Sequence, residues 1–236
     1  MIRNFLKTEW SKLREMNFTD KRQYIWEYYK IHILFIVIGS IAIGSLINIW
    51  FINPPRRSHL YIAWQAGLVH TNHLDEMGER LSVIVDNPDR YHVLVNTYIL
   101  GEDSQINNAM VTRFHALLSV GEVSAIIATY QGIQEGSDFG LLRPPTGVLA
   151  IIREDNPPLY EALLDRLLTI TFEEEDGTYT TDIMAINISG APLVTDVGIE
   201  MDDLYLGLIA NFLYDDRIID ALAVMFDLSE AVRRHN

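Results

Sequence analysis

An uninterrupted apolar segment stands near the start of the chain. From Ile31 to Pro55 there is no Asp, Glu, Lys or Arg, and within residues 33–52 only small residues and Asn48 interrupt the apolar run. As a helix, residues 31–52 would rise about 33 Å, enough to cross a hydrocarbon core. A buried core helix or a cleaved signal peptide is the alternative, but the run is apolar on every side and ends in a Pro-Pro-Arg-Arg motif. We predict a transmembrane helix over residues 31–53.

The charged and aromatic flanks of this segment predict its orientation. Only Arg56 and Arg57 follow the segment directly. Five basic residues lie in the nearby N-terminal stretch, namely Lys12, Arg14, Lys21, Arg22 and Lys30. Aromatic residues gather at both ends, as in interfacial belts: Tyr24, Trp26, Tyr28 and Tyr29 before, Trp50 and Phe51 after. The positive-inside rule therefore predicts a cytoplasmic N-terminus, a cell-membrane location and an extracytoplasmic domain over residues 57–236.

Residues 1–30 form a short amphipathic flank in this scheme. Their apolar residues are spaced by about three and four, as on a helix face: Phe5, Leu6, Trp10, Leu13 and Met16. A break follows at residues 17–20, with Thr19 or Asp20 as the expected N-cap of the helix that enters the bilayer. The flank is either a surface-lying helix that contacts a partner or a basic stretch that only sets topology.

Small residues crowd one half of the apolar segment. Ser40 and Gly44 form a small-xxx-small pair, which lets two helix backbones approach closely in lipid. This pattern makes a homo-oligomer through the span one expectation, although Gly and Ala are common in membrane helices for no special reason.

Beyond the proline pair, strand-like and helix-like patterns alternate. The runs 60–64, 91–100 and 123–129 are rich in β-branched and aromatic residues, whereas 74–85 and 106–120 place apolar residues on one helical face. This βαβαβ alternation predicts an α/β domain with a mostly parallel sheet. The second half predicts a helix over 159–168, a hairpin of 169–174 and 178–188 around Asp176-Gly177, a strand over 204–211 and a helix over 217–226.

Charge and composition exclude several classes of function. All four lysines lie in the first thirty residues, and residues 58–236 carry nine Arg against twenty-eight Asp and Glu. The net charge of −14 argues against nucleic acid as a partner. The absence of cysteine excludes disulfides, thiolate zinc sites and cysteine nucleophiles. A domain without lysine has no Walker A motif and no Schiff-base lysine, so we expect no enzyme and no cofactor.

Two clusters carry residue types that bind metals. His70 and His73, followed by Asp75 and Glu76, have a metal-like spacing, but the segment reads as a loop that leads into a helix. The acidic run 173–176 lacks the alternating oxygen spacing of a calcium loop and suits a solvated hairpin tip. We predict no metal site.

Parallel-sheet geometry points to one place for a ligand. Ligands of open α/β sheets bind beyond the carboxyl ends of the strands. The candidate ligand-binding residues at those ends are Trp64, Gln65, Glu102, Tyr130 and Gln131. The two aromatic rings would stack on a ligand while the glutamines donate hydrogen bonds. The alternative is that Trp64 and Tyr130 pack between structural elements.

Several segments resemble the type 2 extracytoplasmic solute-binding proteins. They are FHALLSVGEVSAIIATYQGIQEGSDFGLLR (within 110–143), AINISGAPL (185–193), LYLGLIAN (204–211) with the helix over 215–226, and YIWEYYKIHILF at the membrane entry, which resembles anchored relatives in Gram-positive bacteria. The resemblance implies a reduced periplasmic-binding-protein-like domain with a β-hairpin subdomain, residues 145–190 forming a reduced second lobe. Ser124 and Thr129 stand where the family often carries acidic residues, and about 180 extracytoplasmic residues are fewer than usual for two lobes.

The resemblance implies a membrane-tethered domain that binds or senses a small ligand for a transporter. The alternative is a non-catalytic scaffold subunit that reuses the fold to assemble with itself or with other membrane proteins, since fold alone does not imply function.

Overall fold

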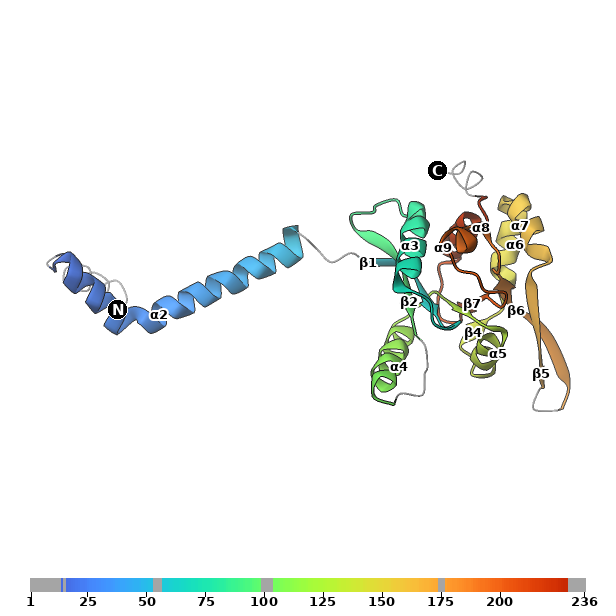
Figure 1. The fold of residues 1–236 in the computed structure, drawn as a ribbon, viewed down its shortest axis with the longest axis horizontal. Coiled ribbons are helices and arrows are strands. Elements are labelled where there is room, and N and C mark those ends of the chain that lie inside the picture. Colours follow the sequence, from blue (N-terminus) through green and yellow to red (C-terminus); the bar gives the residue numbers. More distant parts are fainter. Residues whose placement is uncertain (1–13, 15, 53–56, 99–103, 174–176, 229–236) are drawn as a thin grey trace. The chain divides into compact units, whose positions relative to one another are not determined.

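The computed structural model describes residues 14, 16–52, 57–98, 104–173 and 177–228. The chain divides into two compact units, Met1–Pro55 and Arg56–Asn236 (Figure 1). The amphipathic pattern over residues 5–13 and the connecting residues 53–56 lie outside the described residues.

The N-terminal unit contains one long helix. Helix α2 spans Phe18–Ile47 and continues as a π-helical segment, Asn48–Ile52. Its stretch Trp26–Trp50 has a mean hydropathy of 2.3 over its most apolar part and none of that part is buried, so the prediction of one helix long and apolar enough to cross a membrane is confirmed. The predicted start was wrong. The N-cap is Asn17, and Thr19 and Asp20 lie inside the first turn, where a carboxylate is favourable beside the positive helix end.

The second unit is built on a single mixed sheet. Its strands are β1 (Arg57–Trp64), β2 (Tyr91–Thr97), β3 (Ala125–Ala128), β4 (Leu142–Arg143), β5 (Leu167–Glu173), β6 (Tyr179–Asn187) and β7 (Tyr205–Ile209). They lie in the order β2-β1-β3-β7-β6-β5, with β4 beside β7. Strand β1 pairs in parallel with β2 and β3, as the βαβαβ pattern predicted. Every other pairing among the described strands is antiparallel, so the sheet as a whole is mixed.

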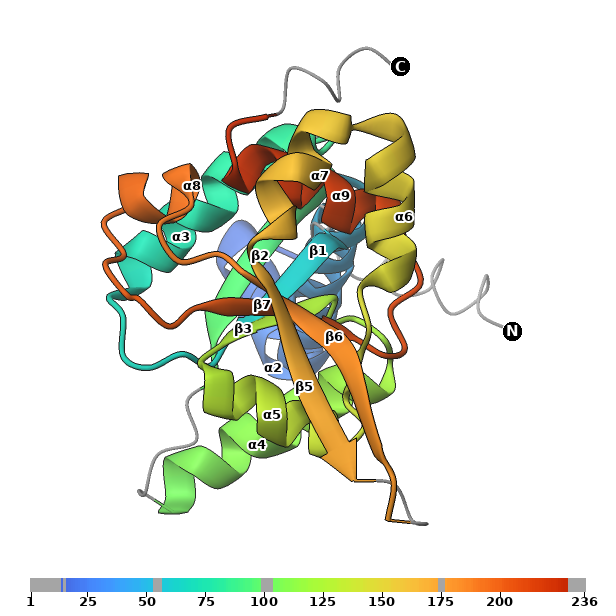
Figure 2. The ribbon, with the colours of Figure 1, turned by 90° about the vertical axis from the view of Figure 1, so that its right-hand side faces the viewer.

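Helices cover both faces of this sheet. They are α3 (Thr71–Leu81), α4 (Ser104–Ser119), α5 (Tyr130–Asp138), α6 (Thr146–Asp155), α7 (Pro157–Leu164), α8 (Pro192–Asp196) and α9 (Asp215–Met225). Figures 1 and 2 show α3, α6, α7, α8 and α9 above the sheet and α4 and α5 below it. The domain is therefore a three-layer α/β/α structure, and β1 and β3, whose residues are buried over most of their length, form its centre.

Glycine lets helix α3 approach the sheet closely. A Cβ added at Gly78 in α3 would lie 3.0 Å from the carbonyl oxygen of Val93 in β2. The next turn supplies a hydrogen bond, because the Val93 N–H donates to Ser82 Oγ at 3.2 Å. Helix α3 and the turn after it therefore cover part of the outer edge of β2, and natural sheets protect exposed edges in this way.

Beyond β3 the structure differs from the sequence-based expectations on two points and agrees on a third. Residues 165–168 are not helical, because α7 ends at Leu164 and β5 begins at Leu167. Helices α5 and α6 were not predicted; both are short, and Gly and Pro residues obscure their apolar pattern. The hairpin is confirmed, since β5 and β6 pair in antiparallel fashion around a tip, 174–176, that lies outside the described residues.

Residues 145–190 were expected to form a reduced second lobe. Strands β5 and β6 instead continue the same sheet through β7, and the whole of Arg56–Asn236 is one compact unit. The reason is that β7 pairs with β3 on one side and with β6 on the other, which joins the two halves of the domain through backbone hydrogen bonds.

Candidate functional site

The carboxyl ends of β1 and β3 form the topological switch point of the parallel part of the sheet. The chain leaves β1 toward α3 on one face and leaves β3 directly into α5 on the other (Figure 2). The two strand ends lie side by side, because Trp64 pairs with Ile127 and the Gln65 N–H donates to the Ile127 carbonyl at 2.7 Å. The structure thus brings together residues 64–65 and 130–131 at the position where open α/β sheets bind ligands.

Trp64 is part of the core at this end of the sheet. Its side chain is 0% exposed. The indole Nε1–H donates to the carbonyl of Gly67 at 2.9 Å, across a turn in which Gly67 has a φ of 119°, a value that favours glycine. A ligand has no access to the ring in this conformation, so the packing role is the one that the structure shows for Trp64.

Tyr130 and Gln131 occupy the first turn of α5. Tyr130 is 44% exposed, and the side chain of Gln131 is exposed and donates to Glu135 at 2.8 Å. Gln65 is half-buried on the neighbouring strand end. These three side chains remain available for contact with a ligand, whereas Glu102 lies outside the described residues.

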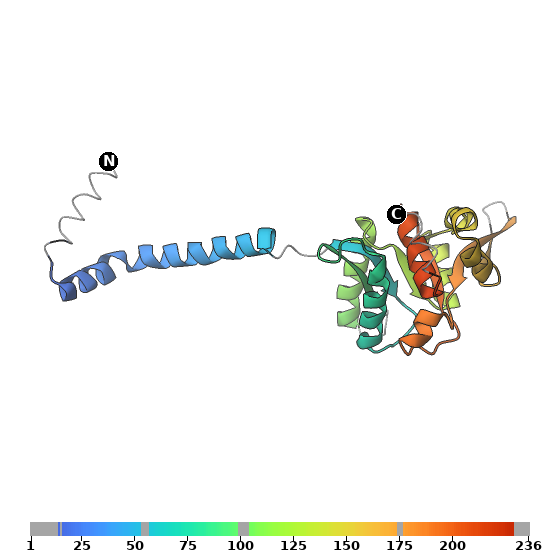
Figure 3. The same cartoon turned by 90° about the horizontal axis from the view of Figure 1, so that it is seen from above.

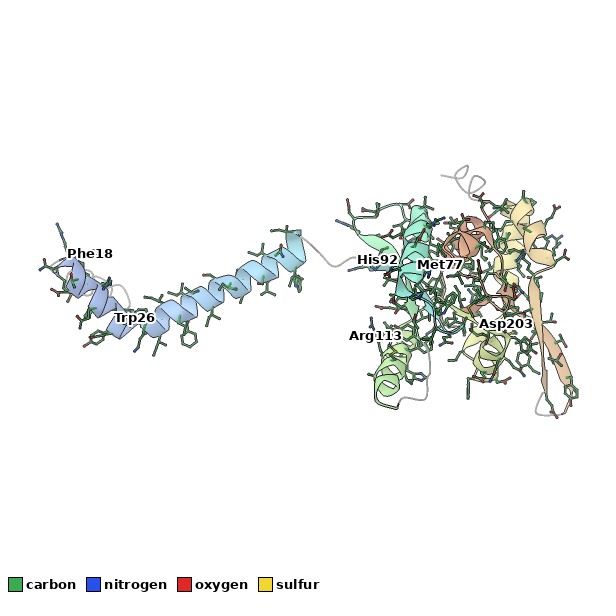
Figure 4. The ribbon with its side chains drawn as sticks, viewed as in Figure 1. Phe18, Trp26, Met77, His92, Arg113 and Asp203 are labelled. Atoms are coloured by element: carbon green, nitrogen blue, oxygen red, sulfur yellow. The ribbon has the colours of Figure 1, made fainter. Side chains whose placement is uncertain are left out.

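Asp203 closes the positive end of helix α5. Its two carboxylate oxygens each lie 3.3 Å from the backbone N of Tyr130, which donates to them, and Figure 4 labels this side chain. Thr129 Oγ1 accepts from the Gly132 N–H at 3.4 Å and so satisfies a second donor of the first turn. An anionic ligand at this helix end would therefore compete with a carboxylate of the protein itself. The pattern analysis missed Asp203, although an Asp-Asp pair directly before a predicted strand was the available signal.

A buried polar network holds the adjacent strand end. The hydroxyls of Tyr61 and Tyr98 hydrogen-bond to each other, and Asn96 Nδ2 donates to Tyr61 Oη at 3.0 Å. Burial, followed by the hydrogen bond to Tyr61, raises the pKa of the Tyr98 hydroxyl, which keeps it neutral at physiological pH. The Tyr98 ring also packs on Phe114 of α4, with ring centroids 5.1 Å apart. This network fixes the end of β2 against the helix layer below the sheet.

A shallow groove of about 470 Å³ runs between α3 and β2. Two carboxylates line the groove, and no Lys or Arg does. Its polar lining residues are Asp75, Glu79, Ser82, His92 and Asn96. Figure 4 labels Met77 and His92 in this region; Met77 is fully buried in the core and lies outside the lining. The groove therefore suits a small polar or cationic group, and the sequence offered no pattern that would have located it.

The histidine pair at the start of α3 has a structural role. His73 Nδ1 hydrogen-bonds to the carbonyl of Val197, and the rings of His70 and His73 are 5.9 Å apart. Among the described residues, no group of three or more His, Asp or Glu side chains is arranged to hold a metal ion.

Three loops at the amino-terminal end of β3 expose apolar side chains. Val120, Phe139 and Leu213 are 70%, 80% and 84% exposed, and we call these three residues the apolar loop cluster. The loops are tied together, because Asn211 Nδ2 donates to the Leu118 carbonyl at 2.6 Å and the Ala210 N–H donates to the Leu141 carbonyl at 2.9 Å. Neighbouring loops that each expose an apolar side chain are a candidate contact surface for another protein, because a contiguous exposed apolar patch commonly marks such a surface.

An electrostatic cluster joins α9 to the start of β1. Arg217 donates to the carbonyl of His59 at 2.7 Å and lies over the ring of Tyr214 at 4.1 Å. Burial, with repulsion from Asp216 and Asp86, raises the pKa of Asp220 from 3.8 to about 6.

No known protein family, curated protein or solved structure matches this chain. The resemblance to solute-binding proteins therefore stays a prediction, and the function rests on the geometry of the domain alone.

Proposed function

We propose that the chain is a membrane-tethered, non-catalytic interaction subunit, whose globular domain contacts another membrane protein. The observation that carries the proposal is the apolar loop cluster. Val120, Phe139 and Leu213 each expose at least 70% of their surface on loops that hydrogen bonds hold in place. Exposing rigidly held apolar side chains to water has a cost that a partner would remove by burying them.

The state of the switch point supports the same proposal. Trp64 is buried, so its ring cannot stack on a ligand, and Asp203 already accepts a hydrogen bond from the first N–H of α5. Strands β5 and β6 continue the same sheet, so the described part of Arg56–Asn236 forms one compact unit and offers no separate lobe to close over a solute. The acidic composition of the domain predicts that the partner surface is apolar with a basic rim.

The test compares partner crosslinking for full-length protein in membranes. The double variant Phe139→Ser with Leu213→Ser should lose about tenfold or more of its crosslinked partner, because two anchors of roughly 1 kcal/mol or more are removed. Leu68→Ser is the matched control. Leu68 is 93% exposed on the loop that follows the carboxyl end of β1, whereas the apolar loop cluster lies at the amino-terminal end of the neighbouring strand β3. Equal crosslinking by the double variant and the wild-type protein would contradict the proposal.

Solute binding is the second candidate function. It is favoured by the position of Gln65, Tyr130 and Gln131 just beyond the adjacent ends of β1 and β3. A small molecule that raises the melting temperature of the wild-type protein, but not of Tyr130→Ala, would favour this function over the interaction subunit.

A further inference from the structure

Strand β5 is the open edge of the sheet. It pairs with β6 on one side, and the strand order places it at the end of the sheet. Figures 1 and 3 show the β5–β6 hairpin on the side of the domain opposite β2. In Figure 2 strand β5 lies nearest the viewer, with no drawn element in front of it. The opposite edge differs, because Ser82 and Gly78 cover β2 around Val93. Among the described strands, β5 is therefore the edge best suited to pair with another strand.

The hydrogen-bond pattern identifies which backbone groups of β5 face outward. The Asn187 N–H donates to the Arg166 carbonyl at 2.7 Å, so the backbone groups of Arg166 point toward β6. The register shift between Leu168 and Thr169 skips Met184 of β6 and no residue of β5, so every second residue of β5 after Arg166 keeps this direction. Leu168, Ile170 and Phe172 share this inward direction. The other residues of β5 direct their N–H and C=O groups away from the sheet. They are Leu167, Thr169, Thr171 and Glu173.

The sequence of β5 is nearly palindromic in character. Residues 168–172 read Leu-Thr-Ile-Thr-Phe, apolar and threonine positions alternating identically in both directions. In an antiparallel pair of two β5 strands centred on Ile170, Thr169 of each copy stands opposite Thr171 of the other. Leu168 then stands opposite Phe172, and Ile170 opposite itself. Threonine pairs and apolar pairs across antiparallel strands are stabilising, and the hairpin already contains one, Thr171 Oγ1 to Thr181 Oγ1 at 2.9 Å.

The acidic end of the hairpin selects the antiparallel direction. Glu173 is followed by three further acidic residues at 174–176. In the antiparallel pair centred on Ile170, Glu173 stands opposite Leu167, and the two acidic ends lie at opposite ends of the new ladder. A parallel pair would bring Glu173 beside its own copy and so add repulsion.

We propose that two copies of this chain assemble by antiparallel pairing of their β5 edges, which joins their sheets into one continuous sheet. The inference rests on the proposed interaction function and names a second copy as one partner. The pairing gives hydrogen-bond partners to the N–H and C=O groups of β5 that face away from β6. Anchoring in a membrane would also raise the effective concentration of the two copies.

The absence of cysteine makes a direct test available. Full-length Thr169→Cys and Thr171→Cys proteins, with different tags, are produced together in membranes and oxidised, so that every disulfide comes from the introduced residues. Opposed residues in a hydrogen-bonded pair have Cα atoms about 5.5 Å apart, within disulfide range, whereas Thr169 and its own copy would be roughly 8–9 Å apart. We expect the mixed disulfide to exceed both like-with-like products at least fivefold.

A charge placed on the edge provides the second measurement. Thr171→Lys should reduce copurification of two tagged copies about tenfold, because a lysine on an edge strand opposes pairing. Thr181→Lys is the matched control, since it adds the same charge, lies on the neighbouring strand β6 and breaks the same threonine pair. It should leave copurification within about twofold of wild type.

Four outcomes would overturn the strand pairing, and the first three concern two copies of this chain. They are equal yields of mixed and like-with-like disulfides, equal effects of Thr171→Lys and Thr181→Lys, and copurification that Gly44→Leu abolishes while Thr171→Lys leaves it unchanged. A disulfide or crosslink from Thr171→Cys to a protein of another size, without the mixed product, would also overturn it. None of these results alters partner crosslinking through Phe139 and Leu213, so failure here is distinguishable from failure of the proposed function.

Discussion

Trp64 is the largest fully buried side chain among the described residues of the domain, and its burial decides its role. Removing a buried tryptophan side chain leaves a cavity and costs about 3–5 kcal/mol. We expect Trp64→Ala to lower the free energy of unfolding by this amount, measured by urea denaturation followed by circular dichroism. Leu68→Ala, four residues away on an exposed side chain, should change it by less than about 0.5 kcal/mol. A Trp64→Ala domain as stable as the wild type would show that the ring is not core.

Asp220 makes the stability of the domain depend on pH. Burial and the charges of Asp216 and Asp86 raise its pKa to about 6 from 3.8, so its ionised form is less favourable in the folded protein than in the unfolded chain. The destabilisation is complete above about pH 6 and is relieved as the pH falls from 6 toward 4.

We therefore expect Asp220→Asn to stabilise the protein at pH 7.5 and to lose that advantage near pH 4.5. Because the carboxylate retains considerable access to water, the gain at pH 7.5 should be about 1 kcal/mol rather than the full value of the pKa shift. Urea denaturation at both pH values, followed by circular dichroism, measures the difference. Glu154→Gln, an exposed change on α6, should give no such pH-dependent difference. A gain that is the same at both pH values would contradict the assignment to Asp220.

At the level of elements, the sequence predicted those whose apolar pattern is long and regular. The three parallel strands, α3, α4, α9 and the hairpin all have a clear period of two or of about 3.6, and each was found within a few residues. Helices α5 and α6 were missed because they have nine and ten residues, and Gly132, Gly136 and Gly147 lower the helix propensity of their segments. Residues 165–168 were assigned to a helix because apolar residues continue through Leu167 and Leu168, which local pattern alone cannot divide between helix and strand.

The candidate site was predictable only as far as topology determines it. The order of strands and helices placed residues 64–65 and 130–131 at one switch point, and in the structure the ends of β1 and β3 that precede them are adjacent, because Trp64 pairs with Ile127. Whether a side chain there is open to a ligand depends on packing over long sequence separations. Asp203 reaches α5 from 73 residues away, and Trp64 is covered by its own turn. Such contacts have no periodic signature in a single sequence.

At the scale of the whole molecule, the distribution of charge is more informative than its total. Every lysine precedes the apolar segment, while the globular domain is strongly acidic. The positive-inside rule counts the Lys and Arg residues near a span, and their excess before this span predicts an N-terminus in the cytoplasm, whereas the acidic residues of the domain contribute little to the prediction. The candidate span Trp26–Trp50 supplies the helix on which this orientation depends.

The orientation can be measured with single cysteines, because the natural chain has none. Leu68→Cys lies in the domain, where Leu68 is 93% exposed, and Arg14→Cys lies at an exposed position before the span. A membrane-impermeant maleimide added to intact cells should label Leu68→Cys and leave Arg14→Cys unlabelled, since a charged reagent does not cross the bilayer. After permeabilisation both variants should be labelled to a similar extent, which controls for reactivity. Labelling of Arg14→Cys alone in intact cells would reverse the orientation, and labelling of both would show that the segment does not span the membrane.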